Sequence, residues 1–152
     1  KPTATVIAIG AVCGLVAITP ASGFVDVPAA IVIGVIAGLI SNVIASWRME
    51  RTALDDTLDV FACHGVSGIW GALATGIFAQ LAINSAGANG LLYGNPGLMV
   101  AQVIAIVVSA SWAFIGSFIL LKIINAVMGL RVEPKHEDIG LDLSQHGEKA
   151  YD

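Results

Sequence analysis

The chain has 152 residues, of which 57% are hydrophobic and 12% are charged, and its mean hydropathy is +0.86. This balance lies far from that of a soluble globular domain. The glycines show no three-residue period, which excludes a collagen-like protein, and two cysteines are too few for a disulfide-rich one. A net charge of -4 without a basic stripe argues against nucleic acid as a partner. The composition therefore predicts a protein whose main solvent is membrane lipid.

Four apolar segments match a bilayer core about 30 Å thick, which requires about 20 helical residues. The first stops at Pro20, the second begins at Pro28 and ends at Trp47, and the third is opened by Asp59 as an N-cap. The fourth is long enough to require tilt. The predicted spans are 4–19, 28–47, 60–83 and 98–127.

The basic residues predict the orientation of these spans. All seven lie on the cytoplasmic side if both ends of the chain are cytoplasmic, whereas loops 21–27 and 84–97 contain no Lys or Arg. We therefore expect an all-α polytopic helix bundle in the cytoplasmic membrane, with a transmembrane region over 1–130 and a cytoplasmic tail over 131–152. The charged composition of the tail leaves open whether it is solvated, disordered or folded.

The third predicted span contains His64, about one turn inside an otherwise uncharged segment. An ionisable group at this depth is costly and usually faces a cavity or a partner. One interpretation is a neutral imidazole that donates to a backbone carbonyl; the favoured one is a role in a pathway or in proton handling. With α-helical spacing, Val60 and Gly68 lie one turn on either side of His64. Such a narrow, mostly apolar path suits a small neutral molecule with a hydrogen-bonding end.

Small residues recur at three- and four-residue spacing in the same span. Gly65, Gly68 and Gly71 are the main ones, and they predict a face on which a neighbouring helix approaches closely.

Signals for a cofactor, a metal ion or an enzyme active site are weak. Cys13 and Cys63 form no C-x-x-C pair, so we expect two reduced packing cysteines, no metal and no cofactor. The sequence contains no phosphate loop or nucleophile elbow, and its acidic cluster before the third span is best explained by helix capping. We therefore expect a protein that is not an enzyme.

Three motifs in order, covering essentially the whole chain, resemble the ammonium transporter (Amt/Mep/Rh) family. The run DVFACHGVSGIWGALATGIFA at 59–79 is similar to a late signature helix of that family. The stretch LVAITPASGFV at 15–25 is similar to a preceding motif, and the segments at 129–132, 140–142 and 146–151 resemble its cytoplasmic tail.

The resemblance implies a homotrimer whose subunits each have eleven spans and a pore, with this chain supplying the last four spans and the tail. His64 matches the second of two paired pore histidines, Val60 and Thr19 would line or border the conduit, and Asp59 would be a polar anchor at the inner mouth. The first histidine and the outer ammonium site belong to earlier spans, so this chain alone should lack a complete pore.

The implied function is transport of ammonium or ammonia, with the proton travelling separately through the histidine pair. The tail would contact the cytoplasmic face and a PII-type regulatory protein. The tail residues at matching motif positions are Arg131, Asp142, His146 and Glu148. Two alternatives remain: an assembly piece that conducts nothing, and an ammonium sensor built on the same scaffold. An unrelated proton-coupled channel would leave the three motifs unexplained.

Overall fold

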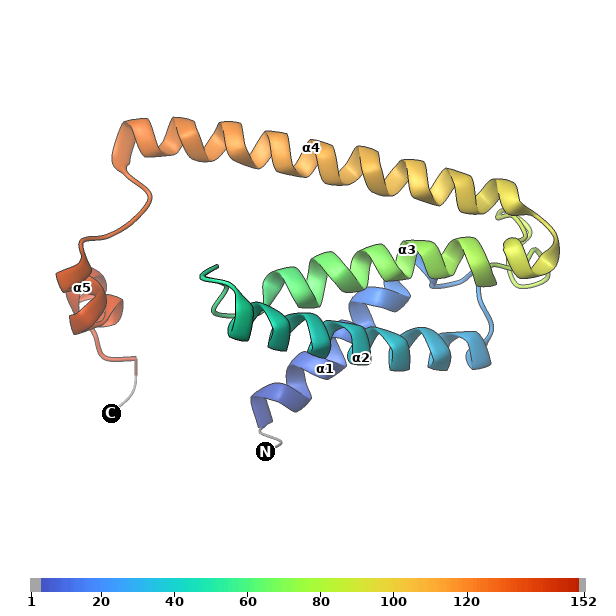
Figure 1. Cartoon of the computed structure of the whole chain (residues 1–152), viewed down its shortest axis with the longest axis horizontal. Coiled ribbons are helices and arrows are strands. Elements are labelled where there is room, and N and C mark those ends of the chain that lie inside the picture. Colours follow the sequence, from blue (N-terminus) through green and yellow to red (C-terminus); the bar gives the residue numbers. More distant parts are fainter. Residues whose placement is uncertain (1–3, 151–152) are drawn as a thin grey trace. The chain divides into compact units, whose positions relative to one another are not determined.

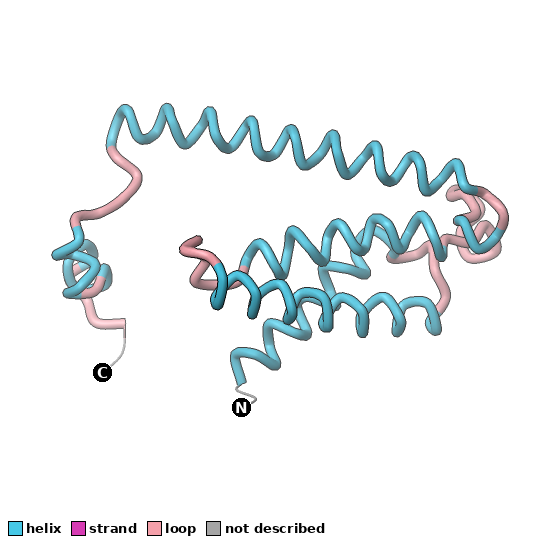
Figure 2. Tube along the Cα trace, viewed as in Figure 1, coloured by secondary structure: helices cyan, strands magenta, loops and turns pink. Residues whose placement is uncertain are grey.

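A computed structural model describes residues 4–150, and it contains helices and loops but no strand over that range (Figure 2). The α-helices of residues 4–150 are α1 (Ala4–Ile18), α2 (Val27–Arg51), α3 (Ser67–Phe78), α4 (Pro96–Met128) and α5 (Pro134–Ile139) (Figure 1). The chain divides into two compact units, Lys1–Val108 and Ser109–Asp152. This boundary falls inside α4, whereas the division predicted from hydropathy falls after the end of that helix.

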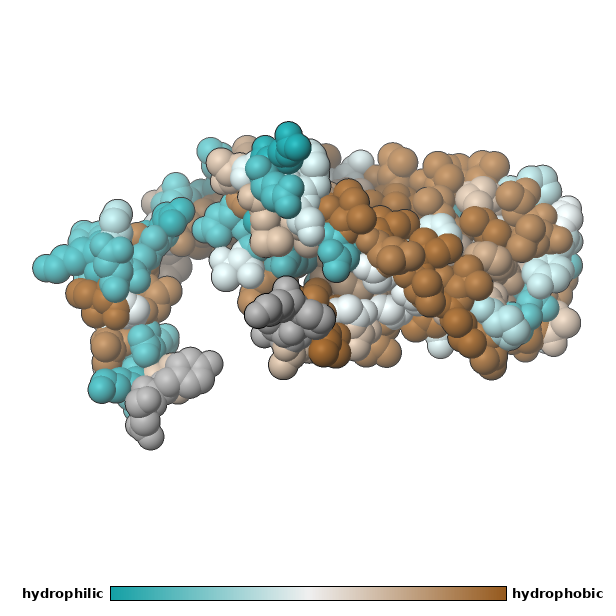
Figure 3. Space-filling model, turned by 60° about the horizontal axis from the view of Figure 1, so that its bottom comes forward, coloured by the Kyte–Doolittle hydropathy of each residue, from teal (hydrophilic) through white to brown (hydrophobic). Residues whose placement is uncertain are grey.

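Within the described residues, three helices are long and apolar enough to cross a membrane: Val27–Arg51, Phe61–Phe78 and Pro96–Met128. The apolar stretch at α1 is shorter and covers Val6–Ala21. It includes the 3₁₀ turn Thr19–Ala21, where Pro20 cannot continue the α-helical hydrogen bonds. Apolar side chains are exposed over much of the surface (Figure 3), as expected for a protein surrounded by lipid or by further helices.

Helix α2 extends one turn beyond the predicted end at Trp47. Its first turn is capped by Asp26, whose Oδ1 accepts the Ala29 N–H at 3.0 Å. Its last turn contains Arg48 and Arg51, whose charges are favourable near a helix C-terminus.

The core of the first unit lies where α1, α2 and α3 pack together (Figure 1), and it is made of small side chains around Ile33. Trp70 and Phe78 pack against this core, and the Trp70 indole N–H donates to the Ile33 carbonyl at 3.0 Å. Ser41 and Ser67 join α2 to α3 through a buried hydrogen bond of 2.8 Å between their hydroxyls. Small core residues let the backbones approach closely enough for these polar contacts.

The start of the predicted span 60–83 agrees with the start of the observed helix, but its end does not. The observed helix begins as a π-helix, Phe61–Val66, which continues directly into α3, and it stops at Phe78. Ala79 then turns to an extended conformation, and the Gln80 N–H donates to the Phe24 carbonyl at 2.9 Å. Gln80 Nε2 also donates to Asp26 Oδ2 at 3.0 Å, so tertiary contacts to the start of α2 end the helix early.

The second unit contains the end of α4, helix α5 and a short π-helix, Asp142–His146. At 33 residues, α4 is about 50 Å long, which exceeds the hydrocarbon thickness of a bilayer. Beyond α4, the tail contains two short helical segments, α5 and the π-helix Asp142–His146, in addition to loops.

Candidate functional site

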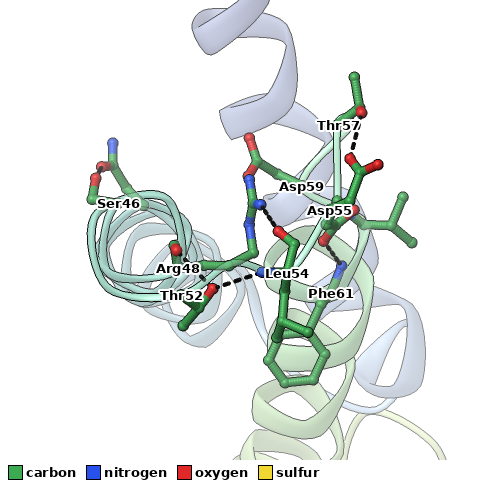
Figure 4. Close-up of polar contacts among 11 residues, drawn as sticks. Ser46, Arg48, Thr52, Leu54, Asp55, Thr57, Asp59 and Phe61 are labelled. Atoms are coloured by element: carbon green, nitrogen blue, oxygen red, sulfur yellow. Dashed lines mark hydrogen bonds and ion pairs between the residues drawn. The ribbon is translucent and has the colours of Figure 1, made fainter. Parts of the chain in front are cut away.

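An ion pair joins the end of α2 to the start of the π-helix. Arg48 Nη2 lies 2.9 Å from Asp59 Oδ1, and the two side chains are 12% and 18% exposed. Arg48 Nη1 also donates to the Leu54 carbonyl at 2.8 Å, so one guanidinium connects both sides of the intervening loop (Figure 4). The Arg48 Nε is buried and has no hydrogen-bond partner among the described residues.

Asp56, rather than Asp59, caps the helix that contains His64. Its Oδ1 accepts the Val60 N–H at 2.8 Å and its Oδ2 accepts the Phe61 N–H at 2.9 Å. Asp59 was the predicted N-cap, but its carboxylate pairs with Arg48 and its φ is +52°, in the left-handed region. Asp59 contributes to the start of the helix through its backbone, because its carbonyl accepts the Cys63 N–H at 2.8 Å. Since this conformation is strained for a residue with a Cβ, the loop geometry must be held by its surroundings.

His64 lies inside the π-helix Phe61–Val66. Single-turn π-helices are rare and often occur at functional sites. A methyl group at Gly65 would come within 3.2 Å of the Phe61 ring, which would have to shift slightly to accept it. The His64 side chain is exposed and makes no hydrogen bond among the described residues.

The other two predicted pathway residues are also exposed. Val60 lies immediately before the π-helix and is 50% exposed. Its α-helical alignment with His64 changes, because a π-helix has a wider turn than an α-helix. Thr19 begins the 3₁₀ turn after α1, and its hydroxyl donates to the Leu15 carbonyl at 2.7 Å.

The three predicted packing glycines have different environments. A methyl group at Gly71 would lie 2.9 Å from the Ala17 carbonyl carbon, so this glycine sits directly against the α1 backbone. Gly65 faces Phe61, as described above. A methyl group at Gly68 would meet nothing within 4 Å.

Two cavities border this region. One, of 380 Å³, lies between α1, α2 and the π-helix and is bordered by Asp59 and Cys63. The other, of 420 Å³, lies near the opposite ends of α1 and α3 and is bordered by Phe24 and Gln102. His64 lines neither of these two cavities.

The tail residues make local contacts within the second unit. Arg131 donates to both carboxylate oxygens of Glu137, at 2.8 and 3.0 Å, and this guanidinium lowers the pKa of Glu137. Asp142 Oδ2 accepts the Ala150 N–H at 3.0 Å, which is the main cause of the lowered pKa of Asp142. His146 ends the short π-helix, and the Glu148 N–H donates to the Asp142 carbonyl at 3.1 Å.

Sequence reasoning did not identify the ion pair of Arg48, and it expected the acidic cluster before the third span to cap the helix without singling out Asp56. Arg48 was interpreted only as a cytoplasmic charge, although its position on the last turn of α2 and the acidic residues soon after it were available signals. Asp56 lies four residues before Val60, and capping from that distance depends on the loop geometry that Asp59 creates.

The apolar helices and the packed small-residue core define a helical, multi-pass membrane protein. A sequence model described as the Ammonium Transporter Family matches residues 1–151. The chain belongs to the ammonium transporter family.

Individual relatives agree with this assignment. Ammonium transporter Amt1 of Archaeoglobus fulgidus is 48% identical over 151 residues, which cover 99% of this chain and 38% of that protein. An ammonium transporter of Bacillus subtilis is 45% identical over 151 residues, which cover 99% of this chain and 37% of that protein. This chain thus spans little more than a third of the length of the curated relatives it matches.

A solved structure also matches. The crystal structure of Saccharomyces cerevisiae Mep2 superposes with a TM-score of 0.80 at 32% sequence identity, over 89% of this chain and 31% of that chain. The all-α membrane fold predicted from the sequence is confirmed.

Proposed function

We propose that the native protein containing this chain moves ammonium or ammonia across the cytoplasmic membrane, and that His64 belongs to its pathway. The family match over residues 1–151 carries the proposal. It is supported by the exposed imidazole of His64, which has no hydrogen-bond partner among the described residues of an apolar span. An imidazole placed in this way can share a hydrogen bond with a small passing molecule.

The proposed chemistry follows from the cost of moving a cation through an apolar segment. Ammonium would lose its proton before entering the apolar region, since a desolvated cation is strongly disfavoured there. Ammonia would then cross as a neutral molecule, and His64 would offer it a hydrogen bond. Val60 and Thr19 would border the conduit, and Asp59, held by Arg48, would keep the inner end of the His64 segment in place.

The proposal extends to topology and partners. Both ends of this chain would be cytoplasmic, according to the distribution of basic residues. The subunits would form homotrimers, and the tail would contribute to contacts with a PII-type regulator. Arg131, Asp142, His146 and Glu148 are the tail residues proposed for those contacts, of which Arg131 already pairs with Glu137.

Uptake of labelled methylammonium, an ammonium analogue, tests the proposal. The native protein is expressed in cells that lack their own ammonium uptake, and the same protein is reconstituted in liposomes. We expect uptake that excess ammonium suppresses in both systems. Binding of ammonium without uptake would instead favour the sensor, and neither binding nor uptake would favour a non-conducting assembly piece.

A further inference from the structure

The two cysteines of the chain lie together although they are fifty positions apart in the sequence. Cys13 belongs to α1 and Cys63 to the π-helix that packs against α1, and both residues line the same cavity. Both are buried, with 2% and 4% of their surfaces exposed, and neither forms a disulfide. The fold therefore places two thiols at one cavity, although the sequence contains no C-x-x-C motif.

Both thiols border the 380 Å³ cavity between α1, α2 and the π-helix. Met49 lines the same cavity and is 62% exposed, so a thioether lies near its rim and two thiols lie deeper. The residues lining this cavity thus include both cysteines of the chain and Met49, whereas Met99 and Met128 do not line it. Soft sulfur ligands are thus concentrated around one space that is large enough for an ion.

We propose that Cys13 and Cys63 form a binding site for a soft monovalent cation of the Cu(I) or Ag(I) type, with Met49 as an additional thioether ligand. Thiolate and thioether ligands select such ions over hard cations. A zinc site is disfavoured, because it normally requires four ligands and the described residues contain no group of three or more His, Cys, Asp or Glu that could hold a metal. A soft monovalent ion, by contrast, is satisfied by two sulfur ligands.

Binding at this site involves no change of oxidation state. The ion forms one bond to each sulfur, and each S–H bond that breaks on binding releases its proton to solvent. The affinity therefore rises with pH, by about tenfold per pH unit for each proton released.

Silver ion is the probe, because it has the charge and softness of Cu(I) and is stable in air. The native protein in detergent is titrated with Ag⁺ against a competing chelator, and bound silver is counted by native mass spectrometry. In parallel, alkylation of each thiol by iodoacetamide is measured on peptides with and without Ag⁺. We expect one silver ion at this site, and protection of Cys13 and Cys63 together.

Variants separate this site from adventitious binding. Cys13→Ser and Cys63→Ser should each weaken Ag⁺ binding by at least about 10- to 100-fold, and Met49→Leu should weaken it less. Met99→Leu, which removes a sulfur that does not line this cavity, should change nothing.

Three results would overturn the proposal. They are unchanged Ag⁺ affinity in the Cys13→Ser/Cys63→Ser double variant, protection of only one of the two thiols, and a Cys13–Cys63 disulfide in the native protein. The alkylation experiment uses the unmodified protein, so the proposal stays testable if a serine variant fails to fold.

Discussion

Arg48 at the end of α2 and Asp59 ahead of the π-helix are joined by a 2.9 Å ion pair that closes the loop between the two helices. The backbone of Asp59 has a φ of +52°, a conformation that residues with a side chain rarely adopt. Because His64 lies five residues after Asp59, this pair fixes the start of the segment that presents the proposed pathway histidine.

Removing one partner of the ion pair should destabilise the protein, because it leaves the other partner's charge unpaired. Asp59→Ala leaves the largely buried guanidinium of Arg48 with only the Leu54 carbonyl, which we expect to cost about 1.5–3 kcal/mol. The double variant Arg48→Leu/Asp59→Ala should be more stable than the sum of the single changes by about 1 kcal/mol. Thermal unfolding of the native protein in detergent measures this cycle, and additive losses would contradict a direct interaction.

Asp56 should stabilise the π-helix only while it is ionised. Its pKa is lowered, mainly because its carboxylate accepts the Phe61 N–H, with the Val60 N–H and Arg48 adding to the effect. Because the folded-state pKa lies below the ordinary value of 3.8, the contribution is fully present above that pH and is lost as the pH falls through the lowered pKa.

The matching variant is Asp56→Ala, which should lower stability by about 1 kcal/mol at neutral pH. The difference from the unmodified protein should shrink as the pH falls below 3.8. Asp55→Ala is the control, since among residues 4–150 the Asp55 carboxylate accepts the Thr57 hydroxyl, at 3.1 Å, and no helical N–H. Equal losses in the two variants would show that capping by Asp56 is not the cause.

Gly71 and Gly68 should respond oppositely to the same substitution. Gly71→Ala places a methyl group against the Ala17 backbone and should cost about 1–3 kcal/mol by overpacking, or separate α1 from α3. Gly68→Ala meets open space and should be neutral or slightly stabilising, because alanine favours a helix. Unfolding temperatures of the two variants check this, and a tolerated Gly71→Ala would mean that α1 does not pack here in the native protein.

The sequence predicted the parts of the fold that depend on composition and length. Long apolar segments had to become helices, because a bilayer leaves no other partner for their backbone groups. Pro20 ended the first segment as expected, since its ring blocks the next helical hydrogen bond. The end of α3 at Phe78 was not predictable, because it depends on contacts from Gln80 to Phe24 and Asp26, which are distant in the sequence.

The sequence singles out His64 as a candidate, but it does not predict the backbone geometry around this residue. His64 was conspicuous as an ionisable group in an uncharged span, and that signal needs no structure. The π-helix around it gave no such signal, because α- and π-helical sequences share the same apolar residues and differ only in backbone register. The shared cavity that Cys13 and Cys63 line likewise arises only when α1 packs against the π-helix.

The most direct test of the account is the ammonium-evoked current of the native protein in liposomes, compared with its His64→Ala variant. Ile69→Ala, an exposed apolar position of α3, is the control and should behave as the unmodified protein does. We expect His64→Ala to change the ammonium current, or its selectivity against potassium, by at least about tenfold, equal to roughly 1.4 kcal/mol. Unaltered current and selectivity in His64→Ala would contradict the role assigned to this histidine.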